Sequence, residues 1–248
     1  MTGSILVGID ASTPSHSALV WSIKRAVSTN ASLELLHVLD SADADRDAAA
    51  RLLQRELQFA RQSAPDLLIT TNLTNGPAED ALARRSVGHA MLVVGTHKTG
   101  FIYGQTFGSR FLELAWRAHC DVAFIPDQGG FTRRGVVAAA EGSPTGAAIV
   151  RFAADEAAAS AQDLTLVGAT RAAASAGSVL ALAARPALRV YSRVSALAPA
   201  QALIAASSNA ALLVVGRPAR PCGSTAGRSG NHDVLLNMAC PVVVICAG

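Results

Sequence analysis

The sequence has few aromatic residues and no cluster of basic ones. Phe, Trp and Tyr make up 4% of the 248 residues, and the net charge of +3 comes without any run of Lys or Arg. Nucleic-acid-binding surfaces use a basic stripe and, for single strands, aromatic rings on which bases stack. Nucleic acid is therefore not an expected partner.

Long apolar stretches are lacking too. The first one, after Met1-Thr-Gly-Ser, spans five residues, which is too short for a signal peptide. Nowhere does an apolar span of membrane length run without charges or helix breakers. We therefore expect a cytoplasmic protein that does not associate with membranes.

Motifs of metal sites and of common enzymes are missing as well. The four cysteines show no C-x-x-C pairing, and no histidine stands at metal-ligand spacing from a cysteine or carboxylate. The chain has no Walker phosphate loop, no nucleophile elbow and no G-x-G-x-x-G after its first apolar stretch. We expect structural thiols, no metal and no catalytic residue, so an enzyme is the less favoured hypothesis.

What the sequence does contain is an internal repeat. Residues 4–12 and 135–143 are each a short apolar stretch that ends in an acidic residue, Asp10 or Glu141, and then a small-residue turn with a proline. Both stretches are typical of buried parallel strands that lead into a helix. The match returns at residues 91–95 and 212–216, Met-Leu-Val-Val-Gly and Leu-Leu-Val-Val-Gly, at an offset of 121.

Helical periodicity fills the intervals between these apolar stretches. Leu19, Ile23, Ala26 and Val27 predict one apolar helix face, and Ile149, Phe152, Ala153 and Ala157 predict its counterpart. Further strands are predicted at residues 33–39, 164–168, 122–125 and 242–246. Further helices are predicted over four turns around residues 49–60, and at 172–184, 109–118 and 229–239.

Strands that alternate with helices predict a parallel sheet covered on both faces. The fold class is therefore α/β, with two tandem Rossmann-like domains of about five strands each. The expected boundaries are residues 1–127 for the first domain, 128–134 for a linker and 135–248 for a shorter second domain. Ligands of such sheets bind beyond the carboxyl ends of the strands, where the strand order reverses, so the loops after the first and fourth strands are the place to search.

Residues 7–12, Val-Gly-Ile-Asp-Ala-Ser, and residues 95–100 with Gly108 and Ser109 resemble the universal stress protein family, and the resemblance extends to both copies. ATP-binding members carry Gly, two residues, Gly, nine residues, and then Gly with Ser or Thr. Gly95, Gly108 and Ser109 match this motif, whereas Lys98 stands in place of the second glycine. The resemblance implies an adenine nucleotide, ATP with Mg²⁺, as cofactor.

The resemblance further implies that Asp10, with Ala11 and Ser12, lies beside the adenosine, and that Val38 offers its backbone to adenine. A physical argument supports the rest of the motif: a glycine lets the backbone approach a ribose closely, and a Gly-Ser pair at a helix start suits a phosphate. Lys98 either obstructs the phosphates or supplies a charge to them. The second copy keeps Gly216, but Glu141 replaces the aspartate, Ala219 replaces the second glycine, and the helix opens with Arg228-Ser229-Gly230, one residue later than expected. Glu141, Gly216 and Ser229 are therefore weaker candidates, and we expect this second site to be weakened or empty.

Each of these residues also has a structural interpretation. Asp10 is a common turn cap, Gly95 and Gly216 suit tight turns, and Ser109 is a good helix N-cap. The hypotheses that remain are an ATP-binding stress or signalling regulator with an unknown protein partner, a nucleotide-free interaction protein, and a weak ATPase. The apolar last strands predict that the two copies pair as an intramolecular pseudo-dimer, and the sequence leaves open a homodimer of the whole chain.

Overall fold

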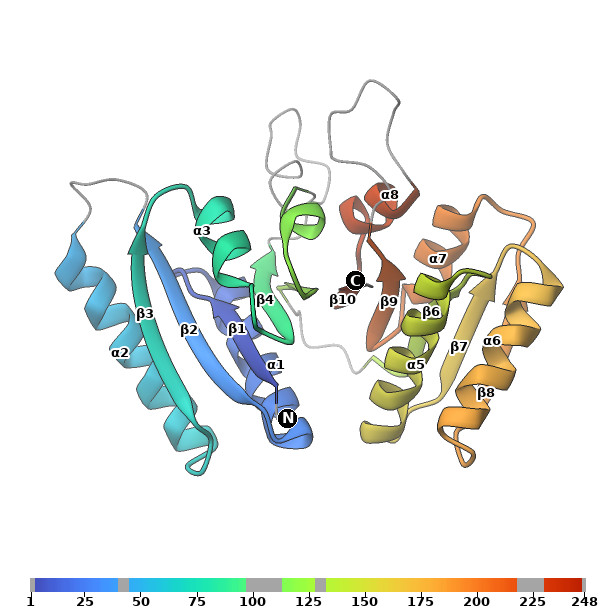
Figure 1. The fold of residues 1–248 in the computed structure, drawn as a ribbon, viewed down its shortest axis with the longest axis horizontal. Helices are drawn as coiled ribbons and strands as arrows, with labels where there is room; N and C mark the ends of the chain where they lie inside the picture. The colour runs from blue at the N-terminus through green and yellow to red at the C-terminus, as the bar shows by residue number, and fades with distance from the viewer. Residues whose placement is uncertain (1–2, 40–44, 97–112, 128–132, 218–229, 247–248) are drawn as a thin grey trace, which may run out of the picture. The chain divides into compact units, whose positions relative to one another are not determined.

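The computed structural model describes residues 3–39, 45–96, 113–127, 133–217 and 230–246. These residues divide into two compact units, of which unit 1 ends at Asp127 and unit 2 begins at Arg133. In each unit, strands alternate with helices and the strand arrows point the same way (Figure 1). None of the helices in the described ranges is long and apolar enough to cross a membrane.

Unit 1 contains five strands and three long helices among its described residues. Its elements are β1 (Ser4–Gly8), α1 (Thr13–Thr29), β2 (Ser32–Leu39), α2 (Arg46–Ser63), β3 (Ile69–Asn75), α3 (Ala78–Arg85), β4 (Met91–Thr96) and β5 (Asp121–Pro126), and residues 113–117 are also helical.

Unit 2 repeats this order. Its elements are β6 (Val136–Ala140), α5 (Pro144–Ala159), β7 (Leu164–Gly168), α6 (Arg171–Ala184), β8 (Val190–Val194), α7 (Pro199–Ser207), β9 (Leu212–Gly216), α8 (Gly230–Leu236) and β10 (Val242–Ile245).

The two sheets have the same topology. Within unit 1 the strand order is β3-β2-β1-β4-β5, and within unit 2 it is β8-β7-β6-β9-β10. All of the pairs within each unit are parallel. Their registers also agree, since Ile5 lies beside Leu33 and Met91 as Val136 lies beside Leu164 and Leu212. The predicted α/β fold with two Rossmann-like domains is confirmed.

Most predicted elements lie where the apolar pattern placed them, with three differences. Val27 was wrongly predicted on the buried face of α1 and is 61% exposed. The first helix after β2 has 18 residues, or five turns rather than four. The last helix was predicted to reach residue 239, but α8 ends at Leu236.

A network of polar side chains surrounds the buried carboxylate of Glu34 in unit 1, beside α3. The Glu34 carboxylate on β2 accepts hydrogen bonds from Arg85 Nε and Nη2 at 2.6 and 2.8 Å and from Asn72 Nδ2 at 3.3 Å, and lies 3.2 Å from His89 Nε2. Burial alone would raise the pKa of Glu34. The hydrogen bonds and charge of Arg85, helped by Asn72 and His89, outweigh burial and hold the pKa below its usual value.

The described cysteines are free thiols. Cys120 and Cys240 are buried and Cys246 is partly buried, whereas Cys222 lies outside the described residues. Burial raises the pKa of Cys240 to about 12, although the nearby charge of Arg133 opposes that shift. The Cys240 thiol is therefore protonated and unreactive at neutral pH.

Candidate functional site

The candidate site lies where the strand order of unit 1 reverses. From β1 the chain proceeds outward through β2 and β3, and then returns to β4 on the other side of β1. The carboxyl ends of β1 and β4 therefore border a crevice between oppositely directed crossovers, where open α/β sheets bind ligands. The topology brings Asp10, Val38 and Gly95 to this one edge.

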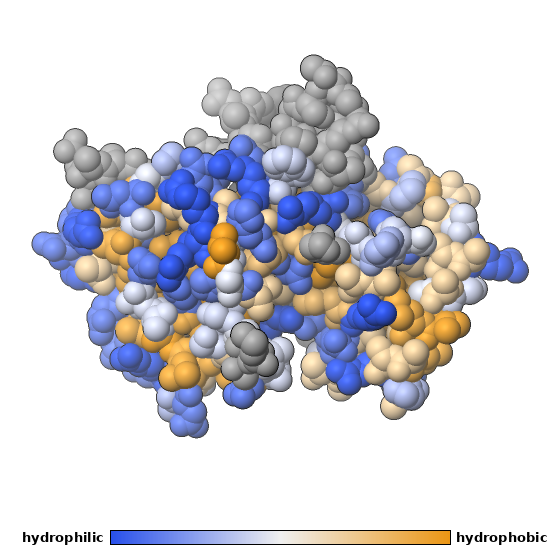
Figure 2. Space-filling model, in the orientation of Figure 1, coloured by the Kyte–Doolittle hydropathy of each residue, from blue (hydrophilic) through white to orange (hydrophobic). Residues whose placement is uncertain are grey.

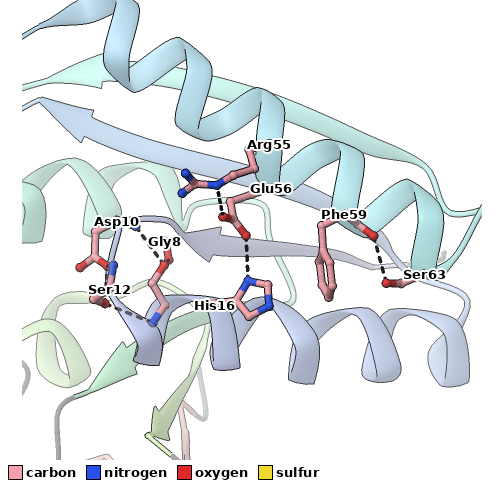
Figure 3. Close-up of polar contacts among 9 residues, drawn as sticks. Gly8, Asp10, Ser12, His16, Arg55, Glu56, Phe59 and Ser63 are labelled. Atoms are coloured by element: carbon pink, nitrogen blue, oxygen red, sulfur yellow. Dashed lines mark hydrogen bonds and ion pairs between the residues drawn. The ribbon is translucent and has the colours of Figure 1, made fainter.

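The loop between β1 and α1 is tightly hydrogen-bonded (Figure 3). Asp10 Oδ1 accepts from the Ser12 N–H at 2.9 Å and from the Ser12 hydroxyl, while the Asp10 N–H donates to Ser15 Oγ at 2.9 Å. Ser12 is the N-cap of α1 and accepts from the Ser15 N–H. Asp10 thus adopts the capping role that its residue type favours, and its side chain remains exposed beside the crevice.

The end of β2 supplies backbone groups to the same edge. The Ile9 N–H donates to the Leu36 carbonyl at 2.8 Å, so Leu36 turns its backbone groups toward β1. Val38 is two residues further and turns its N–H and C=O to the same side, beyond Gly8, where β1 has ended. His37 Nδ1 lies 2.6 Å from the Ile9 carbonyl oxygen and holds the loop against β2.

Gly95 has a role that the sequence did not indicate. A Cβ atom at this position would lie 2.2 Å from the Pro14 carbonyl carbon and 2.4 Å from the Ser15 nitrogen. The end of β4 therefore contacts the first turn of α1 so closely that no side chain fits between them. The glycine permits packing of the protein against itself at the border of the crevice.

A hollow of about 300 Å³ adjoins the loop on the side of α2. His16 Nδ1 lies 2.9 Å from Glu56 Oε2, and Arg55 Nε donates to Glu56 Oε1 at 3.2 Å, so α1 and α2 are tied together beside Asp10 and Ser12 (Figure 3). The ring of Phe59 lies 4.6 Å from that of His16, centroid to centroid. This hollow places acidic and basic groups next to the predicted site.

Several predicted site residues cannot be placed. Lys98, Gly108 and Ser109 in the first copy, and Ala219 and Ser229 in the second, lie outside the described residues. The described part of the candidate site in unit 1 is therefore formed by Asp10, Ala11, Ser12, Val38 and Gly95.

The same edge of unit 2 is built differently. Asn231 Nδ2 on α8 donates to the Gly216 carbonyl at 2.8 Å and lies in front of the strand end. At the start of α5, a Cβ on Gly146 would come 2.1 Å from the Glu141 carbonyl oxygen, so the loop lies directly on the helix. The Glu141 side chain is exposed. The described residues of unit 2 therefore place the Asn231 side chain at the end of β9.

Sequence reasoning missed His37 and Asn231, which contact the two strand ends. Both form hydrogen bonds to residues 28 and 15 positions away in the sequence. Periodicity reports only local relations, and neither residue belongs to a motif. The one available signal was the place of His37 beside Val38 at a predicted strand end.

Comparison with known proteins identifies the family. The model of the universal stress protein family matches residues 1–126, just over half of the 248 residues. The chain belongs to the universal stress protein family.

Among curated relatives, universal stress protein Rv2624c of Mycobacterium tuberculosis is 34% identical over 164 residues, which cover 62% of this chain and 60% of the relative. Universal stress protein Rv1996 of the same organism is 28% identical over 196 residues, which cover 66% and 62%. This universal stress protein thus matches about three fifths of the length of these relatives. The fold resembles the crystal structure of a universal stress protein from Archaeoglobus fulgidus, with a TM-score of 0.77 at 15% identity over 99% of this chain and 97% of that one.

Proposed function

We propose that unit 1 binds an adenine nucleotide, ATP with Mg²⁺, and that the protein acts as a stress-response or signalling regulator. The observation that supports this function best is the convergence of Asp10, Val38 and Gly95 at the carboxyl edge where the strand order reverses. Three separate segments that the resemblance assigns to the nucleotide reach this edge. In this proposal, nucleotide occupancy alters the loop that contains Lys98 and thereby a surface for a protein partner.

The chemistry of the edge suits the nucleotide. An adenine ring presents a donor and an acceptor on its Watson–Crick edge, and the Val38 N–H and C=O offer the complementary pair. The Asp10 carboxylate is exposed and can accept from a ribose hydroxyl while Oδ1 caps the turn. In the proposal, Lys98, Gly108 and Ser109 hold the phosphates and the Mg²⁺ neutralises part of their charge.

We propose that unit 2 binds no nucleotide at its carboxyl edge. Asn231 lies against Gly216, where a ribose would need to approach. Glu141 and the altered motif at Ala219 and Arg228 support the same conclusion. Unit 2 would then act as a structural partner. The pairing of the last strands as a pseudo-dimer and a cytoplasmic location belong to this proposal as well.

Calorimetry with ATP and Mg²⁺ tests the function. We expect one site per chain, and we expect Gly108→Asp to abolish binding because a carboxylate at the predicted helix start would repel phosphate. Gly142→Asp in unit 2 is the matched control, because a Cβ on Gly142 meets no atom within 4 Å, and it should bind as the wild type does. Absence of heat at millimolar ATP, or unchanged affinity of Gly108→Asp, would refute the proposal.

The second candidate is a nucleotide-free interaction protein. Two observations favour it: Ser12 already hydrogen-bonds to Asp10 Oδ1, and α1 occupies the space beside Gly95. Purified protein separates the candidates, since a bound nucleotide raises the absorbance ratio at 260 over 280 nm and is released by acid extraction. A weak ATPase would in addition release phosphate above background, and Gly108→Asp would lose that activity.

A further inference from the structure

The shared register gives each residue of one sheet a counterpart in the other. Leu33 lies beside Ile69 in unit 1 as Leu164 lies beside Val190 in unit 2. By this register Thr165 stands in the place of the buried Glu34, and Arg193 stands in the place of Asn72. The comparison concerns the face of the sheet that α3 covers in unit 1 and α7 covers in unit 2.

The partners of Glu34 are also replaced in unit 2. Ser86 and Ser207 are both buried, and each donates its hydroxyl to the carbonyl three residues earlier. The backbone carbonyl of each serine accepts a hydrogen bond from the N–H three residues later, which belongs to His89 and to Ala210. These equivalent bonds show which residues of α3 and α7 correspond. Ala206 therefore stands in the place of Arg85, and Ala210 in the place of His89. The ion-pair network of unit 1 is thus absent from unit 2.

A hollow of about 600 Å³ lies at that place in unit 2, toward the amino-terminal ends of the strands. Arg134, Arg189 and Arg193 line it, together with Thr165, Tyr191 and Asp163. By register the three arginines replace Gly3, Leu68 and Asn72, which are all uncharged. Unit 2 therefore lacks Glu34 and Arg85 of the network and has three arginines and Asp163 around a hollow of the size that small-molecule sites have.

The charge of the hollow is unbalanced. Arg189 Nε lies 3.1 Å from Asp163 Oδ1. Neither Arg134 nor Arg193 is ion-paired with a carboxylate in the described residues. Three guanidinium groups and one carboxylate leave two positive charges. Guanidinium groups bind phosphate through paired hydrogen bonds, which favours phosphate over a spherical anion. Tyr191 is 52% exposed and lines the hollow beside these charges.

We propose that this hollow of unit 2 binds a small molecule that carries a pyrophosphate group. In this proposal the two linked phosphates bind Arg134 and Arg193, which both line the hollow, and their negative charge is opposite to that of the two unbalanced guanidinium groups. Thr165 provides a hydroxyl donor at the floor, where unit 1 has the repelling carboxylate of Glu34. The site lies at the opposite ends of the strands from the predicted nucleotide site and does not depend on that site.

The test is calorimetric titration of the full chain with sodium pyrophosphate at low salt. We expect saturable binding that Arg193→Asn and Arg134→Gln each weaken about tenfold, because each variant removes a charge-assisted hydrogen bond. Arg151→Gln is the control: Arg151 is exposed on α5, outside the hollow, and its loss should change the affinity less than twofold. Unfolding curves of all variants confirm that they fold.

Further titrations show whether the hollow prefers a nucleotide to free pyrophosphate, and in which unit the pyrophosphate binds. Tighter binding of ADP than of pyrophosphate in the Gly108→Asp background would assign a nucleotide to the hollow, and equal binding would assign the pyrophosphate group alone. No saturable heat in the wild type, or an equal loss in Arg151→Gln, would overturn the proposal. Loss of pyrophosphate binding in Gly108→Asp but not in Arg193→Asn would also overturn it, since the anion would then bind in unit 1.

Discussion

Gly95 illustrates how one residue position can be fixed by a contact rather than by a turn. In Gly95→Ala the new Cβ would lie 2.2 Å from a backbone atom of Pro14 and 2.4 Å from one of Ser15. Backbone cannot move aside as a flexible side chain can, so α1 must shift. We expect the free energy of unfolding to fall by about 1–3 kcal/mol, the usual cost of overpacking. Urea unfolding monitored by circular dichroism measures this loss.

The matched control is Gly216→Ala at the corresponding position of unit 2. There the nearest atoms are side-chain ends, Ile149 Cδ1 at 3.3 Å and Thr145 Cγ2 at 3.4 Å. These atoms can move by a few tenths of an ångström, so we expect a loss of less than about 1 kcal/mol. Equal losses in the two variants would show that the contact with α1 does not determine the glycine at position 95.

The lowered pKa of Glu34 predicts how the stability of the fold depends on pH. The pKa of its carboxyl is lower in the folded protein than in the unfolded chain, so the network stabilises the fold above the unfolded pKa. This contribution is lost as the pH falls through the folded pKa. Urea unfolding at several pH values between about 3 and 7 gives the free energy of unfolding as a function of pH. We expect this free energy to rise less steeply with pH in Glu34→Gln than in the wild type. Glu141→Gln removes an exposed carboxylate and should keep the wild-type slope; a reduced slope there would contradict the assignment.

At the scale of elements, the sequence predicted best the strands that are buried on both faces. The predicted strand 164–168 agrees with β7 at both ends. The apolar pattern did not locate β3 and β8, although about five strands were expected in each half. Residues of β3 include three threonines and two asparagines, and four of the five residues of β8 are exposed. A strand at the edge of a sheet buries too little surface to need an apolar run.

Helix faces were predicted well where burial is deep and less well at their borders. Ala26 is fully buried, and Val27 follows it by one residue, which is a rotation of about 100° and turns the side chain to solvent. The surface over α6 is paler and more orange than that over α2 (Figure 2), because α6 carries one charged residue, Arg171, whereas α2 is rich in arginine. Composition alone could not tell exposed alanine from buried alanine.

The candidate site could be predicted only in part for a related reason. Motif spacing indicated which loops to search, and the topology brings Asp10 and Gly95 to one edge as expected. The physical reason for Gly95 could not be predicted, since it depends on how closely α1 approaches β4 in three dimensions. The same is true of Asn231, whose contact with Gly216 joins two elements of unit 2.

Asn231 connects the start of α8 to the end of β9. In Asn231→Ala the Gly216 carbonyl loses its side-chain donor, and we expect the free energy of unfolding to fall by about 1 kcal/mol. Asn237→Ala is a suitable control, because Asn237 Nδ2 bonds to Asp233 within the same segment at 2.8 Å and joins no two elements. The rate of amide hydrogen exchange in residues 230–236 should rise in Asn231→Ala. Faster exchange in Asn237→Ala than in Asn231→Ala would contradict this role.

At the scale of the whole molecule, the duplication has kept the fold and changed the chemistry. The strand order and the registers agree in the two units, whereas the polar groups on and around the sheets do not. Unit 1 keeps a hydrogen-bonded loop at one edge and a buried ion-pair network at the other. Unit 2 places Asn231 at the first of these edges and three arginines at the second. Under the two proposals, the two copies of one fold bind different ligands.

The proposed division of labour predicts where ATP protects the chain. A ligand at 100 times its dissociation constant stabilises the protein that it binds by about 2.7 kcal/mol. We expect hydrogen exchange to slow in residues 8–16, 36–39 and 93–96 of unit 1 when ATP and Mg²⁺ are added, and to stay unchanged in residues 140–147 and 214–217 of unit 2. Mass spectrometry of peptic fragments measures both.

Gly108→Asp provides the control for this experiment, and the protection of unit 1 should disappear in it. Protection of residues 140–147 that persists in Gly108→Asp would instead show that Glu141 and Gly216 form a working site despite Asn231. Protection of both units that disappears in Gly108→Asp would indicate that binding in unit 1 stabilises unit 2, because a ligand confined to unit 1 slows exchange elsewhere only when the two units unfold together. The location of the protected peptides therefore decides between one nucleotide site and two.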